Sequence, residues 1–132
     1  YRYDVLLTAE AKSIPLAHAL AVQTGRPYIV LRKTYKGYMG QALKAQTFSI
    51  TTGQTQTLYL DEKDIARMAG SVVLLDDVVS TGSTLTAMRQ IVAQAKASVS
   101  AVAAILTEGD NPAEWQDIIA LGHLPLFHIP EA

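Results

Sequence analysis

The chain has 132 residues, of which 49% are hydrophobic, and its formal net charge is −1. This length and composition support one domain with a sizeable apolar core, and the near-neutral charge gives no basic footprint for nucleic acid or an anionic membrane. The absence of cysteine excludes disulfides and thiolate metal sites, and no apolar run approaches the roughly 20 residues that span a bilayer. We therefore expect one cytoplasmic domain over residues 1–132, with no nucleic-acid or membrane partner.

The chain opens with a strand followed by a helix. Residues 5–7 form a short apolar run, and residues 8–12 are the loop that leaves its carboxyl end. Ser13 is a preferred N-cap residue, and Pro15 is tolerated in the first helical turn. Gly25 then predicts the end of the helix. This order of elements indicates the start of a parallel sheet.

Residues 28–31 predict a second strand, and three cations follow it closely. Arg32, Lys33 and Lys36 stand at the carboxyl end of this strand. Clustered positive charge suits a ligand with several phosphate charges, and Arg in particular binds phosphate oxygens bidentately. The cations therefore indicate an anionic ligand at this edge of the sheet.

The segment after these cations breaks the strand–helix rhythm. Residues 46–51 and 57–60 each alternate between polar and apolar side chains, and Gly53 followed by Gln54 is a turn signal between them. The pattern predicts an antiparallel hairpin.

The most informative stretch begins with four apolar residues at 72–75, followed by Asp76 and Asp77. Residues 80–84 form a loop of hydroxyl-bearing residues and glycine, and apolar residues at helical spacing come next. This is the pattern of a buried parallel strand that leads into a crossover helix. Ligands of open parallel sheets bind beyond the carboxyl ends of the strands, which is where this loop is expected.

The loop at residues 80–84 has the chemistry of a sugar-phosphate site. Gly82 lets the backbone approach a ligand, and unpaired N–H groups at the start of a helix bind anions. Two carboxylates would repel a phosphate, so ribose hydroxyls or Mg²⁺ are the natural partners of Asp76 and Asp77. An acidic turn or a helix cap is ordinary by itself, but their order after a buried strand favours sugar-phosphate binding. Neither a P-loop nor a G-x-G-x-x-G motif is present.

The last part of the chain predicts three further elements. Residues 101–106 form another buried strand, and residues 111–122 are expected to form a helix with Trp115 on its apolar face. Residues 124–129 predict a final short strand. Together, the elements indicate an α/β fold.

Residues 72–84 resemble the signature of the type I phosphoribosyltransferases, which bind 5-phosphoribosyl-1-pyrophosphate (PRPP). In that family the acidic pair holds the ribose hydroxyls, and the Thr-Gly-x-Thr loop holds the 5′-phosphate. Residues 9–13 and 32–36 are similar to pyrophosphate-binding stretches of adenine phosphoribosyltransferases, the members that the chain resembles most. The resemblance implies an open parallel sheet of about five strands with helices on both faces. It also implies a flexible flap hairpin at about residues 34–61 and a cis peptide bond between Ala11 and Lys12.

The function that the resemblance implies is Mg²⁺-dependent transfer of a phosphoribosyl group from PRPP to a nitrogenous base, expected to be a purine, with release of pyrophosphate. The implied catalytic residues are Asp76, Asp77, Arg32 and Lys12, and the two aspartates would hold Mg²⁺ indirectly, through ribose or water. A homodimer is also implied. Implied contacts are the base at Val78 and Val79, and PRPP at Ala11, Lys12, Ser13, Arg32, Lys33, Lys36, Asp76, Asp77, Ser80, Thr81, Gly82, Ser83 and Thr84.

Departures from the family leave the base and the function class open. The N-terminal hood that covers the base in family members is expected to be missing, and the flap turn lacks the Glu-Tyr pair of the adenine enzymes. Ser80 stands where hypoxanthine–guanine enzymes place an Asp. These residues therefore do not name the base. The alternative function is a non-catalytic, PRPP-sensing regulatory domain, as in purine repressors that keep this fold.

Overall fold

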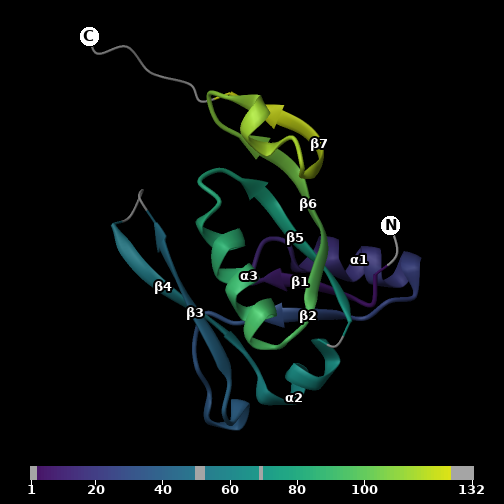
Figure 1. Cartoon of the computed structure of the whole chain (residues 1–132), viewed down its shortest axis with the longest axis vertical. Helices are drawn as coiled ribbons and strands as arrows, with labels where there is room; N and C mark the ends of the chain where they lie inside the picture. The colour runs from purple at the N-terminus through teal and green to yellow at the C-terminus, as the bar shows by residue number, and fades with distance from the viewer. Residues whose placement is uncertain (1–2, 50–52, 69, 126–132) are drawn as a thin grey trace.

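The computed structural model describes residues 3–49, 53–68 and 70–125, and two sheets form its centre (Figure 1). The larger sheet has five parallel strands in the order β2-β1-β5-β6-β7, and the smaller is the antiparallel pair β3–β4. The strands are β1 (Val5–Ala9), β2 (Tyr28–Leu31), β3 (Leu43–Ser49), β4 (Gln54–Leu60), β5 (Ser71–Val79), β6 (Ser98–Glu108) and β7 (Ile119–Leu124). The helices are α1 (Ile14–Thr24), α2 (Glu62–Ile65) and α3 (Ser83–Gln94), and the short 3₁₀ turns are η1 (Gly37–Met39), η2 (Ala66–Met68) and η3 (Pro112–Trp115).

Two strand–helix–strand units build the parallel sheet in opposite directions. The unit β1-α1-β2 extends the sheet on one side, and the unit β5-α3-β6 extends it on the other. Because such crossovers are right-handed, the two helices cover opposite faces of the sheet; α3 lies in front of the strands in Figure 1. The predicted α/β fold, with an open parallel sheet of about five strands and a separate antiparallel hairpin, is confirmed.

Helix α1 begins and ends where the sequence predicts. Gly25 adopts the left-handed conformation with φ 71°, and its N–H donates to the carbonyl of Ala21 at 2.9 Å. Ser13 precedes the first helical residue, but its side chain makes no capping hydrogen bond. Its hydroxyl instead bonds Thr8 Oγ1 at 2.5 Å, which ties the start of the helix to β1. Within the described ranges, no helix is long and apolar enough to cross a membrane.

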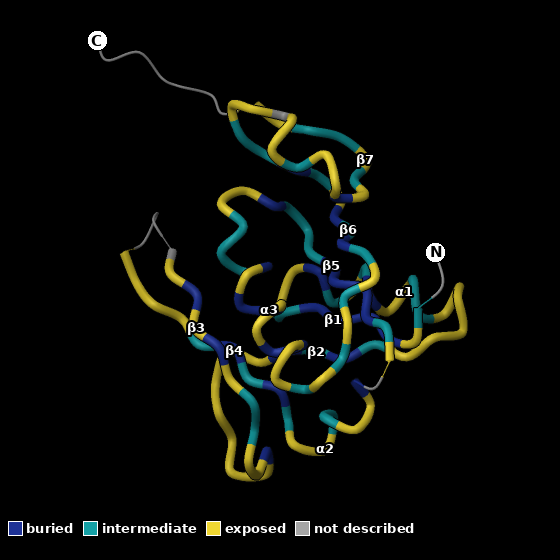
Figure 2. Tube along the Cα trace, viewed as in Figure 1, coloured by how far each residue is buried: buried dark blue, intermediate teal, exposed yellow. Residues whose placement is uncertain are grey.

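The main core lies between the sheet and α3, and the hairpin joins it. Leu74 of β5 and Met88 and Ile91 of α3 are fully buried. Leu58 and Leu60 of β4 belong to the same cluster, and each buried side chain of this size contributes about 1.5–3 kcal/mol. In Figure 2 the buried segments gather in the central strands and α3, whereas the far end of the hairpin is exposed. The base of the hairpin is thus part of the domain core.

The helix predicted over residues 111–122 is wrong. The chain forms η3 and then β7, which lies parallel to β6 at the edge of the sheet. Trp115, Ile118 and Ile119 have helical spacing, but Ile119–Leu124 also alternates and can extend the sheet. Sheet pairing outweighs local periodicity here, because β6 otherwise has an unpaired edge. The strand predicted at 124–129 lies outside the described residues after position 125.

Candidate active site

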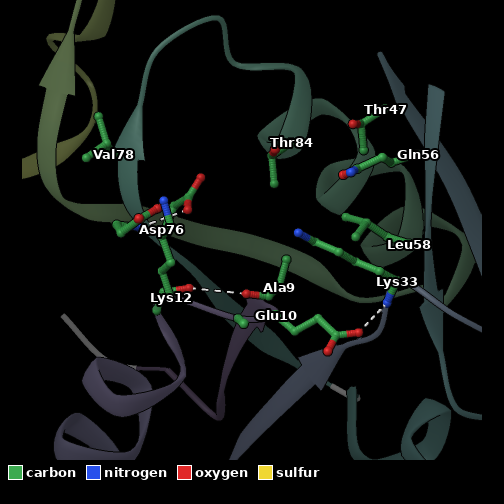
Figure 3. A pocket seen from close by; sticks show the side chains of 13 residues that line it. Ala9, Glu10, Lys12, Lys33, Thr47, Gln56, Leu58, Asp76, Val78 and Thr84 are labelled. Atoms are coloured by element: carbon green, nitrogen blue, oxygen red, sulfur yellow. Dashed lines mark hydrogen bonds between the residues drawn. The ribbon is translucent and has the colours of Figure 1, made fainter. Parts of the chain in front are cut away.

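The carboxyl ends of β1, β2 and β5 open onto a cavity of about 260 Å³ (Figure 3). A second hollow of about 100 Å³ surrounds residues 80–85 and shares Asp76, Val78 and Thr84 with the first. The two hollows therefore adjoin each other. The larger cavity is lined by Ala9, Glu10, Ala11, Lys12, Ser13, Lys33, Thr47, Gln56, Leu58, Asp76, Asp77, Val78 and Thr84.

Strand β5 holds the acidic pair in position. The strand does not end after its apolar run but continues to Val79, which pairs with Thr107 of β6. The backbone of Asp76 and Asp77 is therefore fixed by the sheet rather than by a loop. Asp76 and Asp77 both line the cavity.

The two carboxyl groups differ in protonation. Burial raises the pKa of Asp76 to about 7, and its hydrogen bond to the Asp77 side chain adds to the rise. The backbone N–H of Asp77, which donates to Asp76 Oδ1 at 2.8 Å, offsets part of this shift. Burial also acts to raise the pKa of Asp77, but hydrogen bonds, first that from Asp76, and the charge of Lys12 outweigh it and lower the pKa. The pair therefore retains one proton up to about neutral pH, because burial raises the pKa of Asp76.

A glycine and a tryptophan shape the turn between β5 and α3. Gly82 has φ 81°, a left-handed conformation, and a Cβ added there would lie 2.8 Å from Trp115 Cη2. Only glycine meets both conditions without strain. Ser80 Oγ donates to Glu108 Oε1 at 3.1 Å, and Trp115 Nε1 donates to the Glu108 carbonyl at 3.3 Å. The end of β6 and η3 therefore brace this turn.

The start of α3 has free donors for an anion. Its N-cap is Gly82, so no side chain caps the helix. The first helical hydrogen bond runs from the N–H of Thr86 to the carbonyl of Gly82 at 3.0 Å, which leaves the N–H groups of Thr84 and Leu85 without a helical acceptor. The Ser83 N–H donates to Thr81 Oγ1 at 3.3 Å. The smaller hollow thus has the character of a phosphate site.

Two of the predicted cations reach the larger cavity, and two do not. Lys12 and Lys33 line it, and the Lys33 N–H donates to Glu10 Oε1 at 2.6 Å (Figure 3). Arg32 instead places Nη1 3.9 Å from Glu10 Oε2 and, together with Lys36, lines a separate hollow. Arg32 and Lys33 are adjacent in sequence, just after β2, but they line different hollows.

A family model described as phosphoribosyl transferase domain matches residues 1–122. The chain belongs to this family. The family prediction made from residues 72–84 is therefore confirmed.

Curated relatives from this family include hypoxanthine/guanine phosphoribosyltransferases of archaea. The protein of Methanococcus voltae is 31% identical over 115 residues, which cover 87% of this chain and 58% of that protein. The protein of Methanococcus vannielii is 34% identical over 108 residues, which cover 82% of this chain and 55% of that protein. The chain thus spans just over half the length of these relatives.

Solved structures of adenine phosphoribosyltransferases share the fold. The enzyme of Thermoanaerobacter pseudethanolicus superposes with a TM-score of 0.74 at 21% identity, covering 93% of this chain and 72% of that one. The enzyme of Saccharomyces cerevisiae, solved with an imino-altritol bisphosphate and adenine, superposes with a TM-score of 0.71 at 21% identity. The superposition covers 81% of this chain and 58% of that one. The two comparisons therefore agree on the phosphoribosyl transferase fold and name different purine bases.

The remaining predicted residues of the phosphoribosyl transferase site differ in access. Val78 lines both hollows, whereas Val79 lines only the smaller one and is 2% exposed, packed in the core. Ala11 and Ser13 line the larger cavity. The cis peptide bond lies between Glu10 and Ala11, one residue before the predicted position.

The hairpin adds three cavity residues that the sequence motifs miss, namely Thr47, Gln56 and Leu58. They share the face of the hairpin that points toward the core, because alternate residues of a strand point to the same side. Strand alternation read from the buried end of the hairpin could have identified them.

We expect the shared proton to make stability depend on pH. Between about pH 4 and 7, folded Asp76 keeps a proton that the unfolded chain has lost, so the free energy of unfolding falls as pH rises. The expected fall is about 2–4 kcal/mol, allowing for solvent screening. Asp76→Asn removes it, so the variant gains stability over the wild type at pH 8 but not at pH 4.5. Urea unfolding of both proteins at pH 4.5 and at pH 8 measures this difference in the free energy of unfolding.

The exposed Asp117, which does not line the cavity, provides the control, and Asp117→Asn should keep the wild-type dependence on pH. Parallel stability curves for the wild type and Asp76→Asn would contradict the assignment of the shared proton to Asp76.

Proposed function

We propose that this chain transfers a phosphoribosyl group from PRPP to a purine base and releases pyrophosphate. The observation that carries the proposal is the pair of joined hollows, one with two lysines and one at the start of α3, with Asp76 between them. A sugar that carries a phosphate at one end and a diphosphate at the other matches this arrangement. Family membership and the two transferase relatives described above support the enzyme over the regulatory alternative.

The proposed roles follow from the chemistry of each group. Asp76 and Asp77 hold the ribose hydroxyls, with the protonated carboxyl donating and the ionised one accepting. The loop from Ser80 to Thr84 binds the 5′-phosphate through backbone N–H groups. Lys12 and Lys33 stabilise the charge that develops on the departing pyrophosphate. Catalysis on this proposal comes from positioning and electrostatics rather than from a covalent intermediate.

The remaining residues in the proposal have supporting roles. Arg32 pairs with Glu10 and steadies the loop that carries Lys12, and Lys36 meets pyrophosphate only if the segment after β2 moves. Val78 lies nearest the base, with Val79 behind it. Ala11 and Ser13 present loop backbone to the diphosphate.

The donor set at the cavity fits Mg²⁺ carried in with the substrate. Among the described residues, no group of three or more His, Cys, Asp or Glu side chains is placed to hold a metal ion. Mg²⁺ commonly uses one or two carboxylates and completes its shell with phosphate oxygens and water. Asp76 and Asp77 match that need, directly or through ribose or water, and bound Mg²⁺ would neutralise diphosphate charge. A single domain with a flap at about 34–61, a cytoplasmic location and a homodimer stay predictions.

The test of this function is product formation by the purified chain. Mg–PRPP is mixed with adenine, hypoxanthine or guanine, and the nucleoside monophosphate and pyrophosphate are quantified by chromatography. We expect equal amounts of both products with at least one base. Calorimetric titration of Mg–PRPP without base is the companion measurement. A chain that neither binds Mg–PRPP nor forms a nucleotide would contradict the proposal.

A further inference from the structure

The inward face of the hairpin changes character where it meets the cavity. Two cross-strand pairs on this face are apolar, Leu43 with Leu60 and Ala45 with Leu58, and they pack against the core. The next pair on the same face is Thr47 with Gln56. Thr47 is only 9% exposed, so a hydroxyl occupies a position where packing alone favours an apolar side chain.

Both polar side chains are open to a ligand. Among the described residues, neither the Thr47 hydroxyl nor the Gln56 carboxamide hydrogen-bonds another protein group, and both side chains line the larger cavity. Figure 3 shows them with Lys33 on one side of the cavity, opposite Asp76 and Lys12. A hydroxyl, an amide N–H₂ and an ammonium group on one wall form a set of donors, which suits phosphate oxygens.

The hairpin arms hold these donors in place without substrate. The backbone N–H of Arg32 donates to the Tyr59 carbonyl at 3.0 Å, and the Tyr59 N–H donates back at 2.8 Å. Gln94 Nε2 of α3 donates to the carbonyl of Lys44 at 3.0 Å. The buried Leu58 lies on the same strand as Gln56 and anchors it. These contacts tie the base of the hairpin to β2, α3 and the core, a few residues from the Thr47–Gln56 pair.

We propose that Thr47 and Gln56 are substrate-binding residues that hydrogen-bond the pyrophosphate group of PRPP. The inference rests on the proposed function and extends it to the hairpin. The pyrophosphate end is assigned because Thr47 and Gln56 share a cavity with Lys12 and Lys33, whereas the hollow at the start of α3 has no residue from the hairpin. On this proposal the hairpin arms contribute binding groups to the cavity.

The chain contains a matched control for this proposal. Gln46 pairs with Thr57 directly beside the Thr47–Gln56 pair, on the opposite face of the hairpin. The inward double variant is Thr47→Val with Gln56→Leu, and the outward one is Thr57→Val with Gln46→Leu. Both remove one hydroxyl and one carboxamide from the same two strands, so effects on strand stability are shared between them.

The measurement is calorimetric titration of each protein with Mg–PRPP and, separately, with Mg–pyrophosphate. Losing two hydrogen bonds to a charged group is expected to weaken both affinities by roughly 100-fold or more in the inward variant. The outward variant should stay within about two-fold of the wild type, because its side chains do not line the cavity. Thermal unfolding of both variants checks that each is folded.

Three results would overturn the inference. Equal affinities in the two double variants would mean that the inward pair makes no contact with substrate. Weaker binding of PRPP with unchanged binding of pyrophosphate would move the contact to the ribose. A wild-type chain that binds neither compound would remove the proposed function together with this extension, whereas a binding-competent wild type with an unaffected inward variant removes the extension alone.

Discussion

Replacing Asp76 and Asp77 together by asparagine is expected to abolish detectable binding of Mg–PRPP and to leave the fold as stable as before or more stable. The ionised carboxylate is the acceptor for ribose hydroxyls and the donor for Mg²⁺, and an amide replaces neither role well. In the free protein the same pair destabilises the fold at high pH, because burial disfavours the ionised form of Asp76 and raises its pKa to about 7. Removing the buried acid therefore relieves a cost to folding while it removes the ligand contacts.

Calorimetric titration with Mg–PRPP and thermal unfolding at pH 8 measure the two halves of this prediction. The exposed Asp117→Asn variant is the control and should bind like the wild type. Unchanged affinity of the double variant for Mg–PRPP would contradict the proposal that the acidic pair binds the ribose, even if the stability of the variant rose as expected.

A second large effect is expected from Gly82→Ala in the turn before α3. Alanine at φ 81° costs about 1–2 kcal/mol, and its Cβ would lie 2.8 Å from Trp115 Cη2. The turn or the indole must then move, and a displacement of about 1 Å in a site of this kind lowers turnover by roughly 100-fold. We therefore expect the free energy of unfolding to fall by about 1–2 kcal/mol. The rate of pyrophosphate release should fall by roughly 100-fold.

Gly25→Ala separates backbone strain from the contact with Trp115. Gly25 has φ 71° at the end of α1, and a Cβ there meets nothing within 4 Å. This control should lose about the same 1–2 kcal/mol from backbone strain and keep its activity. If Gly82→Ala behaves like Gly25→Ala in both unfolding and turnover assays, then Trp115 does not constrain the phosphate turn.

Most of the fold could be predicted because its central elements follow local rules. Residues 28–31 coincide with β2, and Gly25 ends α1 as a C-cap glycine should. The error at residues 111–122 has a non-local cause, since β7 exists only because β6 offers a partner edge. The sequence pattern in this segment has helical spacing, and it gives no information about which edge strand of the sheet is unpaired.

The candidate site was predictable in part for a similar reason. The acidic pair and the turn at Gly82 are contiguous in sequence, so one motif contains them. Which cation reaches the cavity depends on the exact residue at which β2 ends, and strand ends are hard to place from sequence to within one residue. To identify Thr47 and Gln56 as cavity residues, one must know the register of the hairpin as well as its existence.

The reciprocal backbone bridge between Arg32 and Tyr59 has a consequence for how this fold can diverge. Lys33 follows the bridge directly, so the origin of its side chain is fixed by main-chain groups of β4 and by the carboxylate of Glu10. Main-chain bonds do not depend on which side chains stand at positions 32 and 59. Exchange of these side chains for any residue but proline therefore leaves the backbone at Lys33 in place, whereas one inserted residue between β2 and position 33 would shift the register there.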